Sequence, residues 1–202
     1  MSLKPNDFFI GLQDFFTILV PGGVFVIFLY FNMDAVTKDL FNILFKDEKF
    51  YNFQFPILLF YSYIFGHVLK RIGRILDIIY DKFFSLKGSD LVEEIKKHKK
   101  EKFKLLSNYE WARFTLLESN SSYANEVERD MVSSKFFRTL VICIIPILIF
   151  FIIKGKLLVD IGLILLLTFS FYQYIHLRKN SVEKTYKYAI YNIHQTKVKN
   201  RE

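Results

Sequence analysis

The residues from Thr139 to Leu177 read TLVICIIPILIFFIIKGKLLVDIGLILLLTFSFYQYIHL, and this stretch decides the fold class. Two apolar runs of 15 and 17 residues, 139–153 and 161–177, flank a break at Lys154-Gly155-Lys156, and neither run contains Asp, Glu, Lys or Arg. Neither run alternates with the period of a strand or leaves a polar face at helical spacing. A helix that is apolar on all sides belongs in a large core or in lipid, and a chain of 202 residues has no core that hides two such helices. The stretch therefore predicts a transmembrane helical hairpin.

The composition favours the same class. Hydrophobic residues make up 52% of the chain and 24 residues are Phe, which is more apolar and aromatic than an ordinary soluble domain. The net charge of +8 is typical of a membrane protein with its polar mass on the cytoplasmic side, and nucleic-acid binding is the alternative explanation. The single cysteine, Cys143, supports neither an intramolecular disulfide nor a zinc site, and we interpret it as a small core-facing residue.

Two further apolar stretches precede the hairpin. Residues 15–33 are 19 residues without a charge, and residues 50–69 are 20 residues without a full charge, so each is long enough to cross a bilayer. A signal peptide is not favoured, because Asp7 and Asp14 follow Lys4 and no small-x-small cleavage site stands out.

We therefore predict an all-α polytopic membrane protein with four transmembrane helices and a cytoplasmic helical region. Its predicted parts are an N-terminal membrane hairpin (1–81, spans about 15–33 and 50–69, the second helix extended to about residue 83), a cytoplasmic helical segment (82–138), a second membrane hairpin (139–177) and a cytoplasmic tail helix (178–202).

The distribution of Lys and Arg predicts the orientation. The two connections after the odd-numbered spans hold five of these residues, whereas residues 70–138 hold 15 and residues 178–202 hold seven. The positive-inside rule then places the middle segment and both termini in the cytoplasm. The predicted location is the bacterial inner membrane, with the chain crossing it several times.

Several packing residues are predicted from local pattern. Pro21-Gly22-Gly23 interrupts the first span and, with Gly66 in the second, gives the predicted kink and packing positions. Because lipid cannot satisfy the carbonyls that such a kink frees, we expect it to face protein. In the tail, Val182, Tyr186, Ala189 and Ile193 form a heptad-like seam that needs a partner, either the helix at 103–117 or the same tail in another subunit.

Two shorter patterns concern the cytoplasmic segment. We expect one helix face to carry five apolar residues, namely Ile72, Ile75, Leu76, Ile79 and Phe83. Asp90 is expected to begin a helix, with Glu93 in the position of a capping box.

The sequence contains no recognisable catalytic motif. No G-x-S-x-G, P-loop or G-x-G-x-x-G is present, and none of the four histidines has an Arg four to six residues before it, as an HEPN-type ribonuclease requires. No ionised group lies deep in a span, which argues against a transporter or proton pump. We predict a protein that is not an enzyme and that carries no cofactor and no metal.

The polar residues suggest three candidate sites. His67 and His176 lie at the cytoplasmic ends of spans two and four, where a metal pair or proton relay is one interpretation and polar interfacial anchors the simpler one. A cytoplasmic polar cluster is predicted from His67, Arg71, Arg74, Glu110, Arg113, Glu128, Arg129, Arg138 and Arg178. Ion pairs between helices are the favoured interpretation of these charges, and a ligand-sensing pocket is the alternative. A partner- or lipid-binding surface is predicted from Lys96, Lys97, Lys99 and Lys100, with a solvated helix face as the alternative.

Asp14, Pro21 and Gly22 form a D-x-x-x-x-x-x-P-G opening similar to that of many small bacterial membrane proteins, and Tyr63-Ile-Phe-Gly66-His67 resembles their second-span signature. Phe136-Phe137-Arg138 before span three and Arg178 after span four also fit. The chain thus resembles the small transmembrane accessory proteins of bacterial defence loci, in particular the accessory family of type VI-B CRISPR systems. The resemblance implies modulation of an RNA-guided ribonuclease, or membrane perturbation after target recognition. The HEPN-like signature of the pore-forming sister type is absent from this sequence.

Three hypotheses follow. In the first, the protein is a non-enzymatic antiphage accessory or effector that oligomerises in the membrane, with pore formation as its action. In the second, it is a membrane-tethered adaptor whose basic cytoplasmic helices bind a protein or RNA partner and modulate an RNA-guided nuclease. The third, an intramembrane enzyme, is the least favoured. The bilayer is the partner common to all three, and a homo-oligomer is expected in the first.

Overall fold

The computed structural model describes residues 5–32, 54–84, 89–99, 107–118 and 122–199. In these ranges every regular element is an α-helix, which confirms the predicted all-helical class. The helices in chain order are α1 (Pro5–Asn32), α3 (Gln54–Phe83), α4 (Asp90–His98), α5 (Asn108–Glu118), α6 (Ser122–Lys154) and α7 (Leu157–Lys199).

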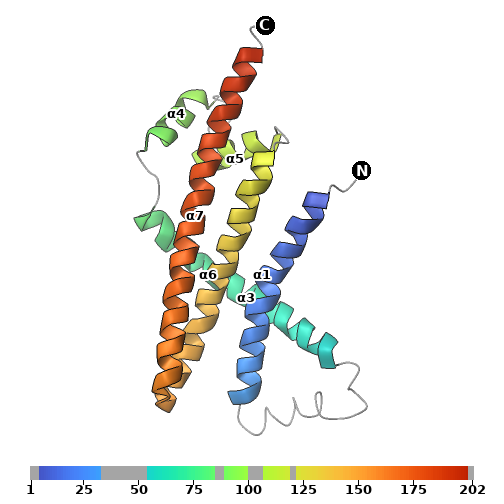
Figure 1. Cartoon of the computed structure of the whole chain (residues 1–202), viewed down its shortest axis with the longest axis vertical. Helices are drawn as coiled ribbons and strands as arrows, with labels where there is room; N and C mark the ends of the chain where they lie inside the picture. Colours follow the sequence, from blue (N-terminus) through green and yellow to red (C-terminus); the bar gives the residue numbers. More distant parts are fainter. Residues whose placement is uncertain (1–4, 33–53, 85–88, 100–106, 119–121, 200–202) are drawn as a thin grey trace.

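Helices α6 and α7 run antiparallel along the length of the molecule (Figure 1). The chain reverses at the predicted break, where Gly155 has a φ of 66° and its N–H donates a hydrogen bond to the Ile152 carbonyl at 3.0 Å. A positive φ costs glycine little because it has no Cβ. Helix α7 is continuous over 43 residues, so the predicted fourth span and the predicted tail form one uninterrupted helix.

Three of the described helices are long and apolar enough to cross a membrane, namely α1 through Phe15–Asn32, α6 and α7. Their apolar side chains lie largely on the molecular surface. Ile153 and Leu158, beside the α6–α7 turn, are 79% and 86% exposed. An apolar surface of this kind is the one that lipid solvates, so the helices are compatible with a membrane protein.

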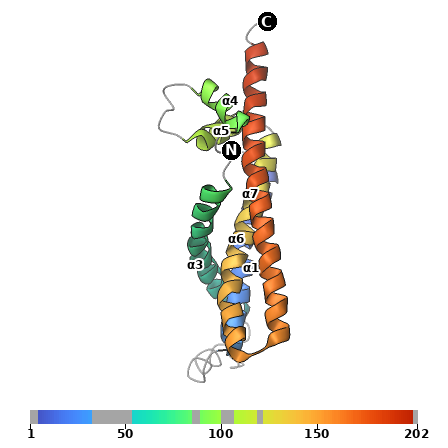
Figure 2. The same cartoon turned by 90° about the vertical axis from the view of Figure 1, so that its left-hand side faces the viewer.

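The predicted second span corresponds to the first part of α3, which is not among these three helices. Its apolar run in the described residues is 55–69, and Lys70 and Arg71 follow at once. In Figure 1, α3 crosses the α6–α7 pair obliquely, and Figure 2 shows it on the same side of that pair as α4 and α5. The described residues therefore give three candidate spans, and the fourth is not confirmed.

Helices α1 and α3 cross almost backbone to backbone. A Cβ added to Gly22 would lie 1.8 Å from the Ser62 carbonyl oxygen, and one added to Gly66 would lie 2.1 Å from the Ile18 carbonyl oxygen. Small residues at such a crossing let two helices approach closely in a membrane. Pro21 and Gly22 are buried here, while Gly23 is half-buried. Helix α1 continues through Pro21-Gly22-Gly23, so the predicted interruption of the helix is not observed. The segment does face protein as predicted, and that protein is α3 of the same chain.

Cys143 joins α6 to the same crossing. Its side chain is fully buried, and its Sγ donates a hydrogen bond to the Pro21 carbonyl at 3.3 Å. Cys143 packs in a cluster with Leu69 and Ile147, so one core connects α3 and α6. The expectation of a small core-facing residue is confirmed.

The buried face of α3 is not the predicted one. In the second half of α3, the buried side chains are Leu69, Leu76 and Tyr80, and the buried Gly73 lies between them. Of the predicted set only Leu76 is buried, and the exposed members are Ile72, Ile75, Ile79 and Phe83. This half of α3 carries apolar residues on two faces, and the face with Gly73 packs inward because it lets α6 come close.

Helices α4 and α5 pack against the C-terminal half of α7. Their shared core contains Val92, Ile95, Trp111, Ala112, Leu116, Val127, Tyr186 and Ala189. The predicted tail seam takes part, since Tyr186 and Ala189 are buried and Val182 and Ile193 pack alongside them. Of the two partners considered for this seam, the helix of the same chain is the one observed.

The capping box predicted at the start of α4 is not observed there. Helix α4 begins at Asp90, but its N-cap is Ser89, which makes no side-chain capping bond. The reciprocal pair occurs at α5, where the Ser107 N–H donates to Glu110 Oε2 at 2.8 Å and the Glu110 N–H donates to Ser107 Oγ at 3.1 Å. That exchange satisfies two amides at the start of α5.

Candidate functional site

A buried polar network joins α3, α6 and α7. The guanidinium of Arg138, with 8% of its side chain exposed, forms an ion pair with the carboxylate of Asp77, and Tyr174 OH donates a hydrogen bond to the other carboxylate oxygen at 2.9 Å. Gly73 leaves room for the arginine, since a Cβ there would lie 3.3 Å from Arg138 Nε. The network fixes the three helices in one register and holds a charged arginine in place.

This network forms one wall of a cationic cleft between α3 and α6. The cleft has a volume of about 700 Å³. Its lining residues are His67, Lys70, Arg71, Arg74, Asp77, Ile78, Lys135 and Arg138.

The charge of the lining is strongly one-sided. It contains five Lys or Arg side chains, and Asp77 is the single acid among the described residues that form it. Both oxygens of Asp77 are already engaged, one by Arg138 and one by Tyr174. Converging cations repel one another, and a low-dielectric wall strengthens that repulsion. An anion in the cleft would relieve it, and Arg side chains match phosphate and carboxylate oxygens with paired N–H donors.

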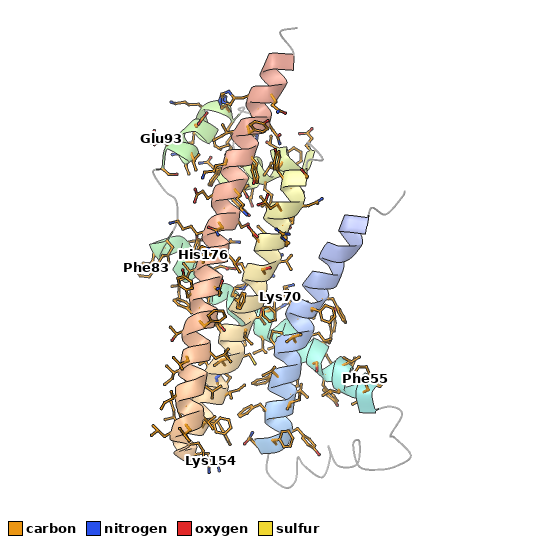
Figure 3. The ribbon with its side chains drawn as sticks, in the orientation of Figure 1. Phe55, Lys70, Phe83, Glu93, Lys154 and His176 are labelled. Carbon is orange, nitrogen blue, oxygen red and sulfur yellow. The ribbon has the colours of Figure 1, made fainter. Side chains whose placement is uncertain are left out.

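The cleft lies at the end of the apolar segments. Lys70 directly follows the apolar run of α3, and Arg138 directly precedes the uncharged run 139–153 of α6. In Figure 3, Lys70 lies near the middle of the molecule, whereas Lys154 lies at the far end beside the α6–α7 turn. The cleft therefore lies at the boundary between the apolar and the polar parts of these helices.

The predicted polar cluster divides into two groups. His67, Arg71, Arg74 and Arg138 line the cleft. The others lie farther along the molecule, on α5 and on the parts of α6 and α7 that pack near it. Arg113 on α5 pairs with Glu128 on α6 at 2.6 Å, and Glu110 caps α5. Arg178 lies over the ring of Tyr109 at 5.9 Å, and Arg129 is exposed. The Ser107 N–H holds the pKa of Glu110 below its usual value, and burial raises the pKa of Tyr109.

The two membrane-end histidines make contacts on their own helices. The ring of His67 meets Tyr63 edge to face at 4.5 Å. His176 lies 3.0 Å from the side-chain nitrogen of Asn180 and stacks on Tyr172. These contacts fit polar anchors, the simpler of the two interpretations.

The predicted lysine surface lies apart from the cleft. Lys96 and Lys97 are exposed on α4, Lys99 follows the helix and is half-buried, and Lys100 lies outside the described residues.

Sequence reasoning missed four residues of the site, Lys70, Asp77, Lys135 and Tyr174. A local signal existed, because Lys70 and Arg74 are one helical turn apart, as are Lys135 and Arg138. Each pair therefore lies on one helix face. No local signal links α3 to α6, because Asp77 and Arg138 are separated by 61 residues.

Fold and site together define an all-helical protein with three helices suited to a membrane and a cationic cleft at the end of their apolar segments. Comparison of the chain with protein-family models, curated proteins and solved structures found no match.

Proposed function

We propose that this protein is a non-enzymatic, membrane-tethered adaptor that binds a phosphate-bearing ligand in its cationic cleft. The observation that carries the proposal is the convergence of five cationic side chains around one carboxylate that is already engaged. Phosphate esters are among the anions that clustered Arg and Lys side chains bind with paired, charge-assisted hydrogen bonds. A cleft of about 700 Å³ also falls in the range of small-molecule sites.

The proposed topology has four spans, with the first part of α3 as the second of them. Support comes from the path of the chain. Helix α1 ends near the level of the α6–α7 turn, whereas α6 begins at the opposite end (Figure 1). If α1 and α6 both cross the bilayer, the chain must cross back between them, and α3 lies there. The cleft, α4, α5 and both termini are then cytoplasmic in a bacterial inner membrane, in agreement with the Lys and Arg distribution.

We favour the adaptor over the oligomeric pore because the two segments expected to drive self-association pack within this chain. The pore hypothesis expected self-association through the Pro21-Gly22-Gly23 kink and through the tail seam. Within this chain the kink packs on α3 and the seam packs on α4 and α5. The defence-locus resemblance supplies the proposed setting, in which the cytoplasmic helices modulate an RNA-guided nuclease.

The ligand chemistry has two sources, the headgroup of an anionic phospholipid and a soluble phosphate ester. In the first experiment, a fluorescent nucleotide is titrated into full-length protein held in nanodiscs of zwitterionic lipid. In the second, the protein is held in nanodiscs with added phosphatidylglycerol, and native mass spectrometry detects the lipid that it retains. Saturable nucleotide binding identifies the soluble ligand, and retained anionic lipid identifies the headgroup.

The cleft variant Arg71→Ala/Arg74→Ala/Lys135→Ala tests the assignment. Its control is Lys96→Ala/Lys97→Ala/Lys99→Ala, which removes the same charge from α4. We expect at least about tenfold weaker binding in the cleft variant, as the loss of several charge-assisted contacts implies. Equal loss in both variants would mean that net charge alone binds the ligand, and no loss in the cleft variant would refute the site.

A further inference from the structure

Helices α4 and α7 bring three metal-ligating side chains together, away from the cationic cleft. Glu94 and His98 lie on α4, and His194 lies on α7. One donor atom from each residue, a carboxylate oxygen or a ring nitrogen, lies within 4.8 Å of the other two. Glu94 Oε1 and His194 Nε2 are 3.2 Å apart, and the two imidazole rings meet edge to face with their centroids 5.7 Å apart.

These distances suit a tetrahedral metal ion. With metal–ligand bonds of about 2.0–2.1 Å, neighbouring ligand atoms of tetrahedral Zn²⁺ lie about 3.3 Å apart. Glu94 Oε1 and His194 Nε2 already have about this separation, and a donor atom of His98 lies within 4.8 Å of both. Two imidazoles and one carboxylate are an established ligand set for Zn²⁺ with a fourth position open to water.

The surrounding core holds the donors in place before any ion binds. Ile95, between the two ligands of α4, is fully buried, and Val92 is buried with it. Ile193, next to His194, packs against the same cluster. Helix α4 has only nine residues, too few for a stable isolated helix, so it depends on contacts with α7.

Without a metal, the polar contact at this position is weak. The Glu94 and His194 side chains are 41% and 57% exposed, and exposed pairs of this kind contribute little to stability. A metal ion that binds all three side chains would add much more, because its binding energy favours the folded state alone.

We propose that Glu94, His98 and His194 bind a divalent transition-metal ion of the zinc class, which clamps α4 onto α7. The proposal uses none of the cleft residues and does not rest on the function proposed above. No metal is predicted from the sequence, and local spacing alone does not reveal this cluster. The spacing on α4 is E-x-x-x-H, which puts both ligands on one helix face, and the third ligand is 100 residues from Glu94.

The test uses full-length protein in detergent, purified without a polyhistidine tag and stripped of metal with a chelator that is then removed. Co²⁺ is titrated while its visible absorption is followed, because tetrahedral Co²⁺ absorbs far more strongly than the aqueous ion, and Zn²⁺ is then added as a competitor. We expect one Co²⁺ per chain, its displacement by Zn²⁺, and slower amide exchange over residues 90–98 when Zn²⁺ is bound.

The variants His98→Ala and His194→Ala are expected to weaken binding by more than about 100-fold, because loss of an outer-shell partner alone already costs about 10–100-fold. His176→Ala, a histidine on α7 outside the cluster, is the matched control and should bind like the parent. Glu94→Gln keeps the shape of the side chain, so it separates ligation from folding. Absence of saturable binding in the parent, or equal binding in the His98→Ala/His194→Ala double variant, would overturn the proposal.

Discussion

Gly22 and Gly66 allow α1 and α3 to touch through their backbones. A Cβ at either position would lie closer than 3.0 Å to a carbonyl oxygen of the other helix. The neighbouring Gly23 differs, because a Cβ there would meet only the Ser62 side chain, at 3.4 Å and beyond. The requirement for glycine therefore depends on the position within the kink.

The variant Gly22→Ala is expected to destabilise the protein by about 1–3 kcal/mol, since overpacking forces the two helices apart. Gly23→Ala should cost far less, and Gly162→Ala, where nothing lies within 4 Å of an added Cβ, should be neutral. Unfolding in a titration with sodium dodecyl sulfate, followed by circular dichroism, gives the three values. Equal stability of Gly22→Ala and Gly162→Ala would contradict the observed crossing.

The Arg138–Asp77 pair has a different role, because it joins helices through charge. Asp77→Asn leaves Arg138 in a largely buried site without its counter-ion. Removal of one partner of a buried pair typically costs ~3–5 kcal/mol, and the lower end is expected here because the Asp77 side chain is 24% exposed. The same detergent titration measures it.

A double variant completes that experiment. Asp77→Asn/Arg138→Met should be more stable than Asp77→Asn alone, since no charge is left unpaired. Additive losses would show that the two side chains act independently.

At the scale of single elements, α5 shows how a short helix is held. Its first turn is closed by the exchange of hydrogen bonds between Ser107 and Glu110. Its inner face places Trp111 and Leu116 in the core that α4 and α5 share with α6 and α7. The cap and the core are separate contributions, so they can be separated experimentally.

The cap makes the stability of α5 dependent on pH. The Ser107 N–H favours the ionised form of Glu110, so the pKa of this residue is lower in the folded protein than its usual 4.5. The stabilisation is therefore complete above that usual value and is lost as the pH falls through the lowered value. Glu110→Ala should lower the thermal midpoint at pH 7 and should lose this effect in acid.

Trp111 is the only tryptophan of the chain and lies on α5, so its fluorescence reports the unfolding of this helix. Glu118→Ala, at the other end of α5, is the control and should show no comparable change between pH 7 and acid. A pH-independent difference between Glu110→Ala and the parent would contradict the role of the carboxylate.

At the scale of the whole molecule, the long α6–α7 pair connects a half with an exposed apolar surface to a half covered by α4 and α5 (Figures 1 and 2). The two halves meet at the level of the cationic cleft. The predicted polar cluster and the predicted spans are thus parts of one rod, with a charged zone between its apolar and polar ends.

The proposed topology can be tested by labelling. Arg129→Cys on α6 and Lys156→Cys at the turn place thiols at opposite ends of the rod, and the buried Cys143 should stay unlabelled. In intact cells, a membrane-impermeant maleimide added from outside should label Lys156→Cys and spare Arg129→Cys. After lysis, both should react. Labelling of Arg129→Cys in intact cells would reverse the proposed orientation.

The sequence by itself determined the helical class, the turn at Gly155 and the inward-facing segment Pro21-Gly22-Gly23, because each depends on local chemistry. An uncharged run as long as 139–153 has few alternatives to a helix, and a break between two such runs has to turn. The seam through Tyr186 and Ala189 was also predicted from the sequence, although the sequence left two possible partners for it open.

Only the tertiary structure decided which face of α3 is buried, where the cations converge and which ligands α4 shares with α7. Asp77 and Arg138 are 61 residues apart, and Glu94 and His194 are 100 residues apart. Periodicity orders the residues of one helix, but it contains no information about the rotation of that helix against its neighbours. That rotation depends on close packing at positions such as Gly73, and so the cleft and the proposed metal ligands come together only in three dimensions.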